Sequence, residues 1–212
     1  SSVAFRIPVE NAGGGAIAVT PDGNTLLTTA SRSNDGRVFV FRSPFSASST
    51  PEVLTIAGTE GLDGINCTPD GQRCLVVSAF TSGLFSIAAP FGAASAVEPI
   101  PLPAAFAAGQ EGFEDVAISN DGQLALVTGN SGKDANGQGG GLPGLFVKAP
   151  FTRAGAQSFA VTILGGGRGA GSARFVACPP PVPPVSPEIV PTGTPAAPVT
   201  ATDFLTARWS AQ

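Results

Sequence analysis

Short apolar runs alternate with turn residues along most of this chain. Runs of about four to eight residues, rich in Val, Ile, Phe and Thr, are separated by clusters of Gly, Pro, Asn and Asp. This pattern is typical of β-strands joined by tight turns, and no stretch shows the apolar period of a helix with caps at both ends. The pattern therefore predicts an all-β protein.

One segment of this pattern occurs three times. Each copy is an apolar run that ends in a Pro-Asp-Gly or Asn-Asp-Gly turn, and the copies occupy residues 15–23, 63–71 and 114–122. The turn residues Asp22, Asp70 and Asp121 are 48 and then 51 positions apart. A period of this length indicates a repeat architecture.

Each repeat contains three further apolar runs after the first. The run after the turn covers residues 26–30, 74–79 and 124–128, and a Gly-led run that ends in Pro-Phe covers 36–45, 83–91 and 144–151. The last run covers residues 52–57, 96–102 and 158–164. Four antiparallel strands in about 45 residues describe a propeller blade. We predict a β-propeller or partial propeller of four-stranded antiparallel blades, with three clear repeats plus incomplete terminal ones.

The ends of the chain fit this repeat only in part. Residues 3–9 are expected to form an outer fourth strand and residues 173–178 another first strand, with weaker strands at 188–190 and 204–209. Four blades would use nearly all of the 212 residues. Three arrangements stay open: a four-bladed ring with one degenerate blade, an open segment that packs on a partner, or an ordered piece of a longer chain. A start at Ser1 without methionine is expected of a processed product.

The composition changes at Pro179. We predict a propeller-like domain over residues 1–178 and a Pro-rich extended tail with a short apolar end over 179–212. Proline fixes φ and removes a donor, so the tail is expected in polyproline II conformation, as a stiff linker or as a stalk with O-linked sugar. Phe204 and Trp209 are candidate contacts that anchor the tail on the body or on a neighbouring subunit.

Composition excludes several classes of function. Charged residues make up 12% of the chain and the net charge is −4, so no basic face for nucleic acid is expected. No run of 18 apolar residues is present, so no membrane-spanning helix is expected. The chain has no His, which excludes Ser-His-Asp and Cys-His catalysis within it and removes a common metal ligand.

The cysteines indicate an oxidising compartment. Cys67 and Cys74 flank the second turn at positions that face each other across a hairpin, and we predict a disulfide between them rather than two buried thiols. Cys178 is then left over, either for another chain or segment or as a buried thiol. Asn66 matches the N-glycosylation pattern, although a chance match is the favoured explanation. We expect an extracellular or cell-surface protein.

Acidic residues gather just before two of the predicted first strands. They are Glu60, Asp63, Glu111, Glu114 and Asp115. The loops before first strands converge at one end of a propeller channel, where oxygen ligands would suit Ca²⁺ or Mg²⁺. The alternative, which we favour, is a repeated turn motif with solvated carboxylates, because the first copy has only glycines at residues 13–15. We therefore expect no cofactor, with Ca²⁺ as the weaker candidate.

The repeated turns resemble those of the YVTN-type and lactonase-like β-propellers. In these families a Ser/Thr-Pro-Asp-Gly turn joins the first two strands of each blade, and the matching segments here are residues 20–23, 68–71 and, less closely, 119–122. The resemblance covers about residues 1–178 and implies blade architecture. Lactonase-like members rely on His or a full acidic metal ring, which this sequence does not show. The tail resembles the linkers of extracellular surface glycoproteins in composition alone.

These observations lead to one predicted function and two alternatives. We predict a secreted or cell-surface, non-enzymatic propeller module for protein or glycan interaction, or for structural assembly of an extracellular complex or filament. A protein partner or self-assembly is expected, with a glycan as a weaker candidate. The alternatives are a lactonase-like propeller hydrolase that uses an acidic Ca²⁺ or Mg²⁺ site, and a soluble ligand-binding or sensor module.

Overall fold

A computed structural model describes residues 15–31, 36–81, 83–106, 112–129 and 144–161, together with Phe175. Several predictions fall outside these residues: the strands at 3–9, 188–190 and 204–209, the domain boundary at 178/179, and the side chains of Glu111, Cys178, Phe204 and Trp209. Phe175 lies in the predicted strand 173–178 but is not in a strand.

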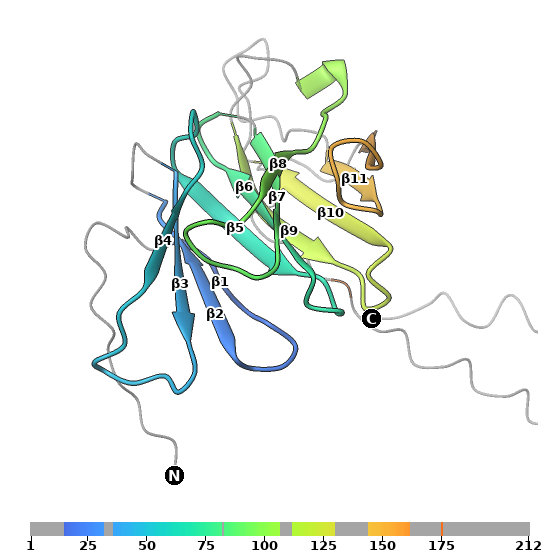
Figure 1. Ribbon diagram of the computed structural model, residues 1–212. Coiled ribbons are helices and arrows are strands. Elements are labelled where there is room, and N and C mark those ends of the chain that lie inside the picture. The colour runs from blue at the N-terminus through green and yellow to red at the C-terminus, as the bar shows by residue number, and fades with distance from the viewer. Residues whose placement is uncertain are drawn as a thin grey trace, which may run out of the picture. The chain divides into compact units, whose positions relative to one another are not determined.

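The described residues form three four-stranded antiparallel sheets, each with its strands in sequence order (Figure 1). The first sheet contains β1 (Ile17–Val19), β2 (Thr25–Thr29), β3 (Arg37–Arg42) and β4 (Glu52–Thr55). The second contains β5 (Leu62–Cys67), β6 (Arg73–Ser78), β7 (Gly83–Ala88) and β8 (Val97–Pro99). The third contains β9 (Phe113–Ile118), β10 (Leu124–Gly129), β11 (Gly144–Lys148) and β12 (Gln157–Val161). The predicted all-β, propeller-like fold of four-stranded blades is confirmed.

The fourth strands are shorter than the sequence pattern predicts. The run at 96–102 forms only the three residues of β8, and a 3₁₀ turn, η1 (Ala104–Phe106), follows it. Pro101 and Pro103 come directly after this strand, and proline has no N–H to continue a ladder. The run at 52–57 likewise stops at Thr55.

Each repeated turn is held by the same hydrogen bonds. A hydroxyl donates to the Asp carboxylate two residues later: Thr20 Oγ1 to Asp22 Oδ1 at 2.5 Å, Thr68 to Asp70 at 2.5 Å and Ser119 to Asp121 at 2.6 Å. In every copy this donation is the main cause that lowers the pKa of the Asp carboxyl, followed by a backbone N–H. The glycines that follow have φ between 69° and 71°, a conformation that favours glycine. These contacts explain why the Ser/Thr, Asp and Gly of the turn recur.

The second turn also carries a disulfide. Cys67 and Cys74 are paired opposite each other on β5 and β6, with their Cα atoms 3.9 Å apart, and a disulfide joins them. This is the predicted pair. Val19 and Leu26 oppose each other at the same place in the first sheet.

The hydrophobic core lies between successive sheets. One cluster combines Leu27, Val38 and Leu54 of the first sheet with Ile65 and Val76 of the second. A second cluster joins the second sheet to the third in the same way. Phe91 and Phe151, which follow the third strands of the second and third sheets, are buried in these clusters. The sheets are therefore held together mainly by apolar side chains that no single sheet could bury alone.

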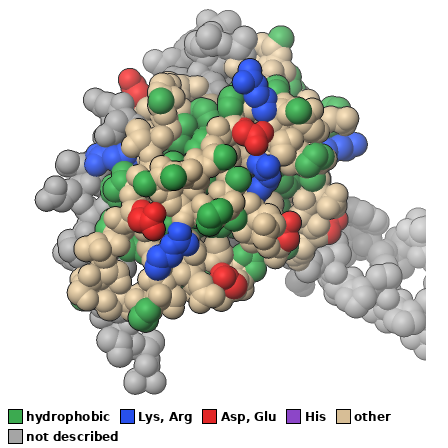
Figure 2. Space-filling model, viewed as in Figure 1, with side chains coloured by type: hydrophobic (Ala, Val, Ile, Leu, Met, Phe, Trp, Pro, Cys, Tyr) green, Lys and Arg blue, Asp and Glu red, His purple; other side chains and the backbone are tan. Residues whose placement is uncertain are grey.

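Charges are sparse on the molecule. On the face shown in Figure 2, acidic and basic side chains are interspersed among polar and apolar ones. In the part of the chain that the structure describes, no helix is long and apolar enough to cross a membrane.

Candidate functional site

The first strands of neighbouring sheets touch each other, and two of them carry an acidic residue at the same repeat position. β5 contacts both β1 and β9. Gly64 of β5 lies against β9 so closely that a Cβ there would be 2.6 Å from Asp115 Cα. Asp63 and Glu114 occupy the same position in consecutive repeats, one on each of these strands, and both are half-buried. Glycine at position 64 therefore allows the acidic pair to form.

The environment of Asp63 favours its protonated form. Burial is the main cause that raises the pKa of the Asp63 carboxyl, and the negative charge of Glu114 adds to it. A carboxyl with a raised pKa is a better proton acceptor once ionised than an ordinary aspartate. Perturbed carboxyls of this kind occur at catalytic sites as well as in structural clusters.

The backbone around the pair is fixed by hydrogen bonds. The carbonyl of Asp63 accepts from Ala16 N, directly before β1, at 3.1 Å and from Thr29 Oγ1 of β2 at 2.5 Å. On β9, Asp115 Oδ1 accepts from Val116 N at 2.8 Å. The acidic pair is therefore carried by strands rather than by a loop, which limits how far its carboxyl groups can move.

The first repeat has no room for a third carboxylate at this level. Its equivalent residue is Gly15, where a Cβ would lie 2.3 Å from Thr29 Oγ1 and 2.5 Å from Thr29 O. Glycine at position 15 is thus a steric requirement of the close approach between this residue and Thr29 of β2.

The remaining predicted metal ligands do not complete a site. Glu60 is exposed, and its backbone carbonyl accepts from Ser78 Oγ at 2.8 Å. Glu111 lies outside the described residues. Among the residues that the structure does describe, no three His, Cys, Asp or Glu side chains are close enough together to hold a metal ion. The described carboxylates do not fit a metal site by themselves, and a Ca²⁺ ion here stays a prediction.

Asn66, the candidate glycosylation residue, is half-buried on β5. The hydroxyl of Thr68, the third residue of its motif, donates to Asp70 and accepts from Arg73 N at 3.0 Å. The motif therefore forms part of the second turn, and glycosylation stays a prediction.

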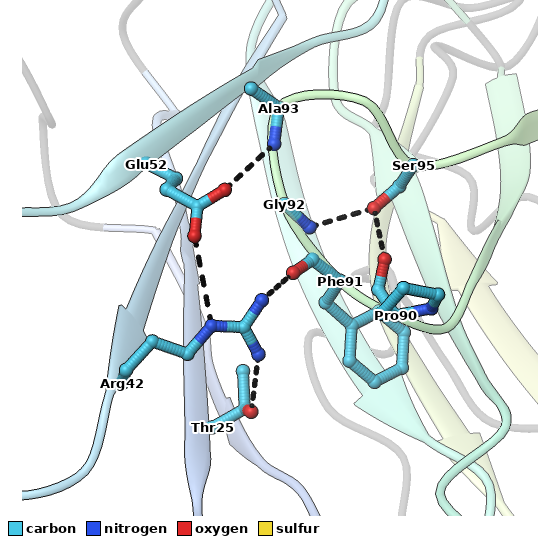
Figure 3. A network of polar contacts seen from close by, with 8 residues as sticks. All are labelled: Thr25, Arg42, Glu52, Pro90, Phe91, Gly92, Ala93 and Ser95. Carbon is cyan, nitrogen blue, oxygen red and sulfur yellow. Dashed lines mark hydrogen bonds and ion pairs between the residues drawn. The ribbon is translucent and has the colours of Figure 1, made fainter.

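A set of contacts that the sequence did not reveal links the sheets at their turn ends. Arg42, at the end of β3, donates from Nη1 to Thr25 Oγ1 at 2.9 Å and from Nη2 to the carbonyl of Phe91 in the next sheet (Figure 3). Its Nε lies 3.7 Å from Glu52 Oε1, and Glu52 Oε2 accepts from Ala93 N at 3.4 Å. We call this arrangement the Arg–Glu clamp.

The Arg–Glu clamp is repeated between the second and third sheets. Arg73 Nη1 donates to the carbonyl of Phe151 at 3.3 Å and lies 3.5 Å from Glu98 Oε1. Arg42 ends the third strand of its sheet, whereas Arg73 begins the second strand of its own. The two arginines thus reach equivalent places from different strands. No fixed spacing marks them in the sequence, which is why a search for repeats misses them.

Two clefts lie next to these clamps, and neither is lined by Asp63 or Glu114. A cleft of about 630 Å³ is lined by Asp70, Arg73, Asp121 and Phe151. A second cleft, of about 450 Å³, is lined by Asp22, Arg42, Asp70 and Phe91. Their Asp side chains already accept the hydrogen bonds of the turns. We therefore place the candidate chemistry at Asp63, where burial and the charge of Glu114 raise the pKa of the carboxyl.

Comparisons with known proteins give the fold. No protein-family model and no curated protein sequence matches the chain. Among solved structures, the periplasmic gluconolactonase PpgL of Pseudomonas aeruginosa aligns with a TM-score of 0.52 at 16% identity over 71% of this chain and 45% of its own. A putative 6-phosphogluconolactonase from Bacteroides uniformis aligns with a TM-score of 0.49 at 13% identity over 68% of this chain and 39% of its own. The aligned part is therefore less than half the length of either structure.

The likeness to the periplasmic gluconolactonase contradicts the prediction of a non-enzymatic module and favours the hydrolase alternative. The lack of His misled the prediction, since it excludes only mechanisms that require an imidazole. Hydrolysis of an ester needs a base for one water proton, and a carboxylate with a raised pKa can serve. At 16% identity this likeness itself shows only that the fold is that of a lactonase-like β-propeller.

Proposed function

We propose that this chain carries the catalytic part of a propeller-type lactone hydrolase, with Asp63 as its general base. The observation that carries the proposal is the juxtaposition of Asp63 and Glu114 on adjacent first strands, in the fold that the periplasmic gluconolactonase shares. The substrate class is a sugar-acid lactone, in keeping with the names of both similar structures.

Asp63 can perform both proton transfers of the reaction. Its carboxylate takes a proton from water while the water oxygen bonds to the lactone carbonyl carbon. The tetrahedral intermediate then collapses with cleavage of the ring C–O bond, and the ring oxygen takes the proton back from Asp63. The product is the open hydroxy acid. Glu114 contributes through its negative charge, which makes Asp63 a stronger base. None of these steps uses a metal.

The disulfide between Cys67 and Cys74 supports a location outside the cytoplasm, where such bonds persist. We propose the periplasm, the cell surface or the extracellular medium as the site of action.

Asp63→Asn tests the assignment of the base. Gluconolactone hydrolysis is followed in a pH-stat, with the spontaneous rate subtracted. We expect the chain to exceed the spontaneous rate, and Asp63→Asn to lower kcat by about 10²–10⁴-fold. Asp121→Asn, which changes a carboxylate in the third turn, serves as the matched control and is expected to keep the activity. No rate above the spontaneous one, or full activity in Asp63→Asn, would contradict the proposal.

A further inference from the structure

Two equivalent turns line the cleft of about 630 Å³, which we call the inter-turn cleft. The turn of the second sheet contributes Asp70 and Gln72, and the turn of the third sheet contributes Asp121 and Gln123. All four residues are exposed. The two turns lie against each other, since a Cβ at Gly122 would be 3.2 Å from the Cδ of the proline just before Asp70. The cleft therefore brings the same pair of polar side chains together twice.

The carboxylates of this cleft can accept further hydrogen bonds. Oδ1 of Asp70 accepts from Gln72 N, and Oδ1 of Asp121 accepts from Gln123 N, both at 3.0 Å. The hydroxyl donations of the two turns also end on Oδ1. The bonds of both turns thus use one oxygen of each carboxylate, and the other oxygen, Oδ2, can accept from a ligand.

Donors come from the two glutamine amides and from Arg73, which also lines the cleft. The Gln72 amide donates to the Asp70 carbonyl at 3.3 Å, and the Gln123 amide donates to the Asp121 carbonyl at 3.4 Å. An amide has a second N–H and a carbonyl oxygen, and a guanidinium has five N–H groups. The cleft therefore presents donors and acceptors side by side.

This mixture suits a neutral ligand with several hydroxyl groups. Two carboxylates disfavour an anion, and the guanidinium of Arg73 opposes the attraction of a cation. A hydroxyl can donate to a carboxylate and accept from an amide or a guanidinium at the same time. Pro69, Ala149 and Pro150 form an apolar part of the lining, against which the C–H groups of a sugar ring can pack. A saccharide has both kinds of surface.

A second cleft adjoins the first at the turn that they share. Asp70 and Gln72 also line the cleft of about 450 Å³, together with Arg42 and Pro90 (Figure 3). The turn ends of the sheets thus present two polar clefts in succession, each with an arginine and a proline. A chain of repeated units can occupy two adjacent sites at once and bind more tightly than a single unit.

We propose that the inter-turn cleft is a saccharide-binding site, in which Asp70 and Asp121 accept from sugar hydroxyls and Gln72 and Gln123 donate to them. The ligand is a neutral oligosaccharide chain, and the adjoining cleft receives further units of it. The site is separate from the proposed hydrolytic chemistry, because neither cleft is lined by Asp63 or Glu114.

An NMR titration of the 212-residue chain tests this proposal. The probes are maltohexaose and chitohexaose, with maltose and chitobiose as their short counterparts and spermidine as a cationic probe. At least one hexasaccharide should give saturable shifts at the backbone amides of residues 70–73 and 121–123. Its disaccharide should bind at least about tenfold more weakly, because it reaches only one cleft.

Gln72→Ala and Gln123→Ala should each weaken hexasaccharide binding by about two- to tenfold, the effect of losing one hydrogen-bonding group. Asn24→Ala is the matched control: Asn24 has the equivalent place in the first turn, where its Nδ2 donates to Asp22 Oδ2 at 3.1 Å, but it lines neither cleft. It should leave binding unchanged. Gluconolactone hydrolysis should be the same in Gln123→Ala as in the wild type, so this site and the proposed base are tested separately.

Several results would overturn the proposal. These are no shift at the two turns with either hexasaccharide, hexasaccharide binding that neither glutamine variant weakens, or shifts at these residues with spermidine alone. Equal weakening by Asn24→Ala would also count against it, because binding would then not depend on the side chains that line the clefts.

Discussion

The contact between β5 and β9 depends on the missing side chain of Gly64, and Gly64→Ala tests it. The added Cβ would lie 2.6 Å from Asp115 Cα and 2.9 Å from both Glu114 O and Val116 N. All three are backbone atoms, which cannot rotate away as the end of a flexible side chain can. The strands must separate by about 0.8 Å to reach the 3.4 Å of ordinary contact.

The expected loss of stability follows from two opposing terms. Overpacking at a rigid contact costs about 1–3 kcal/mol. Replacing glycine restricts the unfolded chain and returns about 0.4–1 kcal/mol. The free energy of unfolding should therefore fall by about 1–2 kcal/mol, and Tm by about 2–8 °C. Separation of the strands also moves Glu114 away from Asp63, so the pKa of Asp63 should fall toward its ordinary value.

Urea denaturation measures the first effect, and NMR titration of the Asp63 carboxyl carbon measures the second. Gly23→Ala is the matched control: position 23 has a φ of 71° in the first turn, and nothing lies within 4 Å of the added Cβ. We expect it to cost about 1 kcal/mol through backbone strain and to leave the Asp63 titration unchanged. Wild-type stability and an unaltered Asp63 titration in Gly64→Ala would refute the close contact of the two strands.

Three further predictions concern stability. Replacing both Cys67 and Cys74 by Ala should lower the free energy of unfolding by about 2–3 kcal/mol, measured in urea without reductant, because the closed loop is short. Asp63→Asn should raise the free energy of unfolding at neutral pH but not below about pH 3.8. The pKa of Asp63 is raised in the folded state, so the wild type loses stability as the pH rises from 3.8 through that pKa, whereas the Asn variant does not. Urea midpoints measured over a pH series check this difference. Arg42→Met should lower the free energy of unfolding by less than about 1 kcal/mol, and by less still at high salt, because the Arg42 side chain is 46% exposed. Arg73→Met should lower it by more, because the Arg73 side chain is only 26% exposed.

The blade architecture can be predicted from the sequence because the turns are local structures. The hydroxyl, carboxylate and glycine of each turn satisfy one another within a few residues, so their spacing repeats in the sequence as it does in space. The disulfide is predictable for the same reason, since Cys67 and Cys74 face each other across one of these turns.

The acidic site is only half visible in the sequence. The sequence shows Asp63 and Glu114 as acidic residues one repeat apart. The effect of Glu114 on Asp63 depends on Gly64, which lets β5 approach β9 closely, and these two strands are distant in sequence. The Arg–Glu clamps are hidden because Arg42 and Arg73 lie on different strands of their sheets. The absence of His does not predict the function, because a carboxylate with a raised pKa can act as a base where no imidazole is present.

The pH dependence of gluconolactone hydrolysis tests the central claim most directly. The account predicts a rate above the spontaneous one that rises with pH as Asp63 ionises, along the titration curve measured for that carboxyl, and that Asp63→Asn abolishes. A rate that is absent, or that follows the same pH profile in Asp63→Asn as in the wild type, would contradict it.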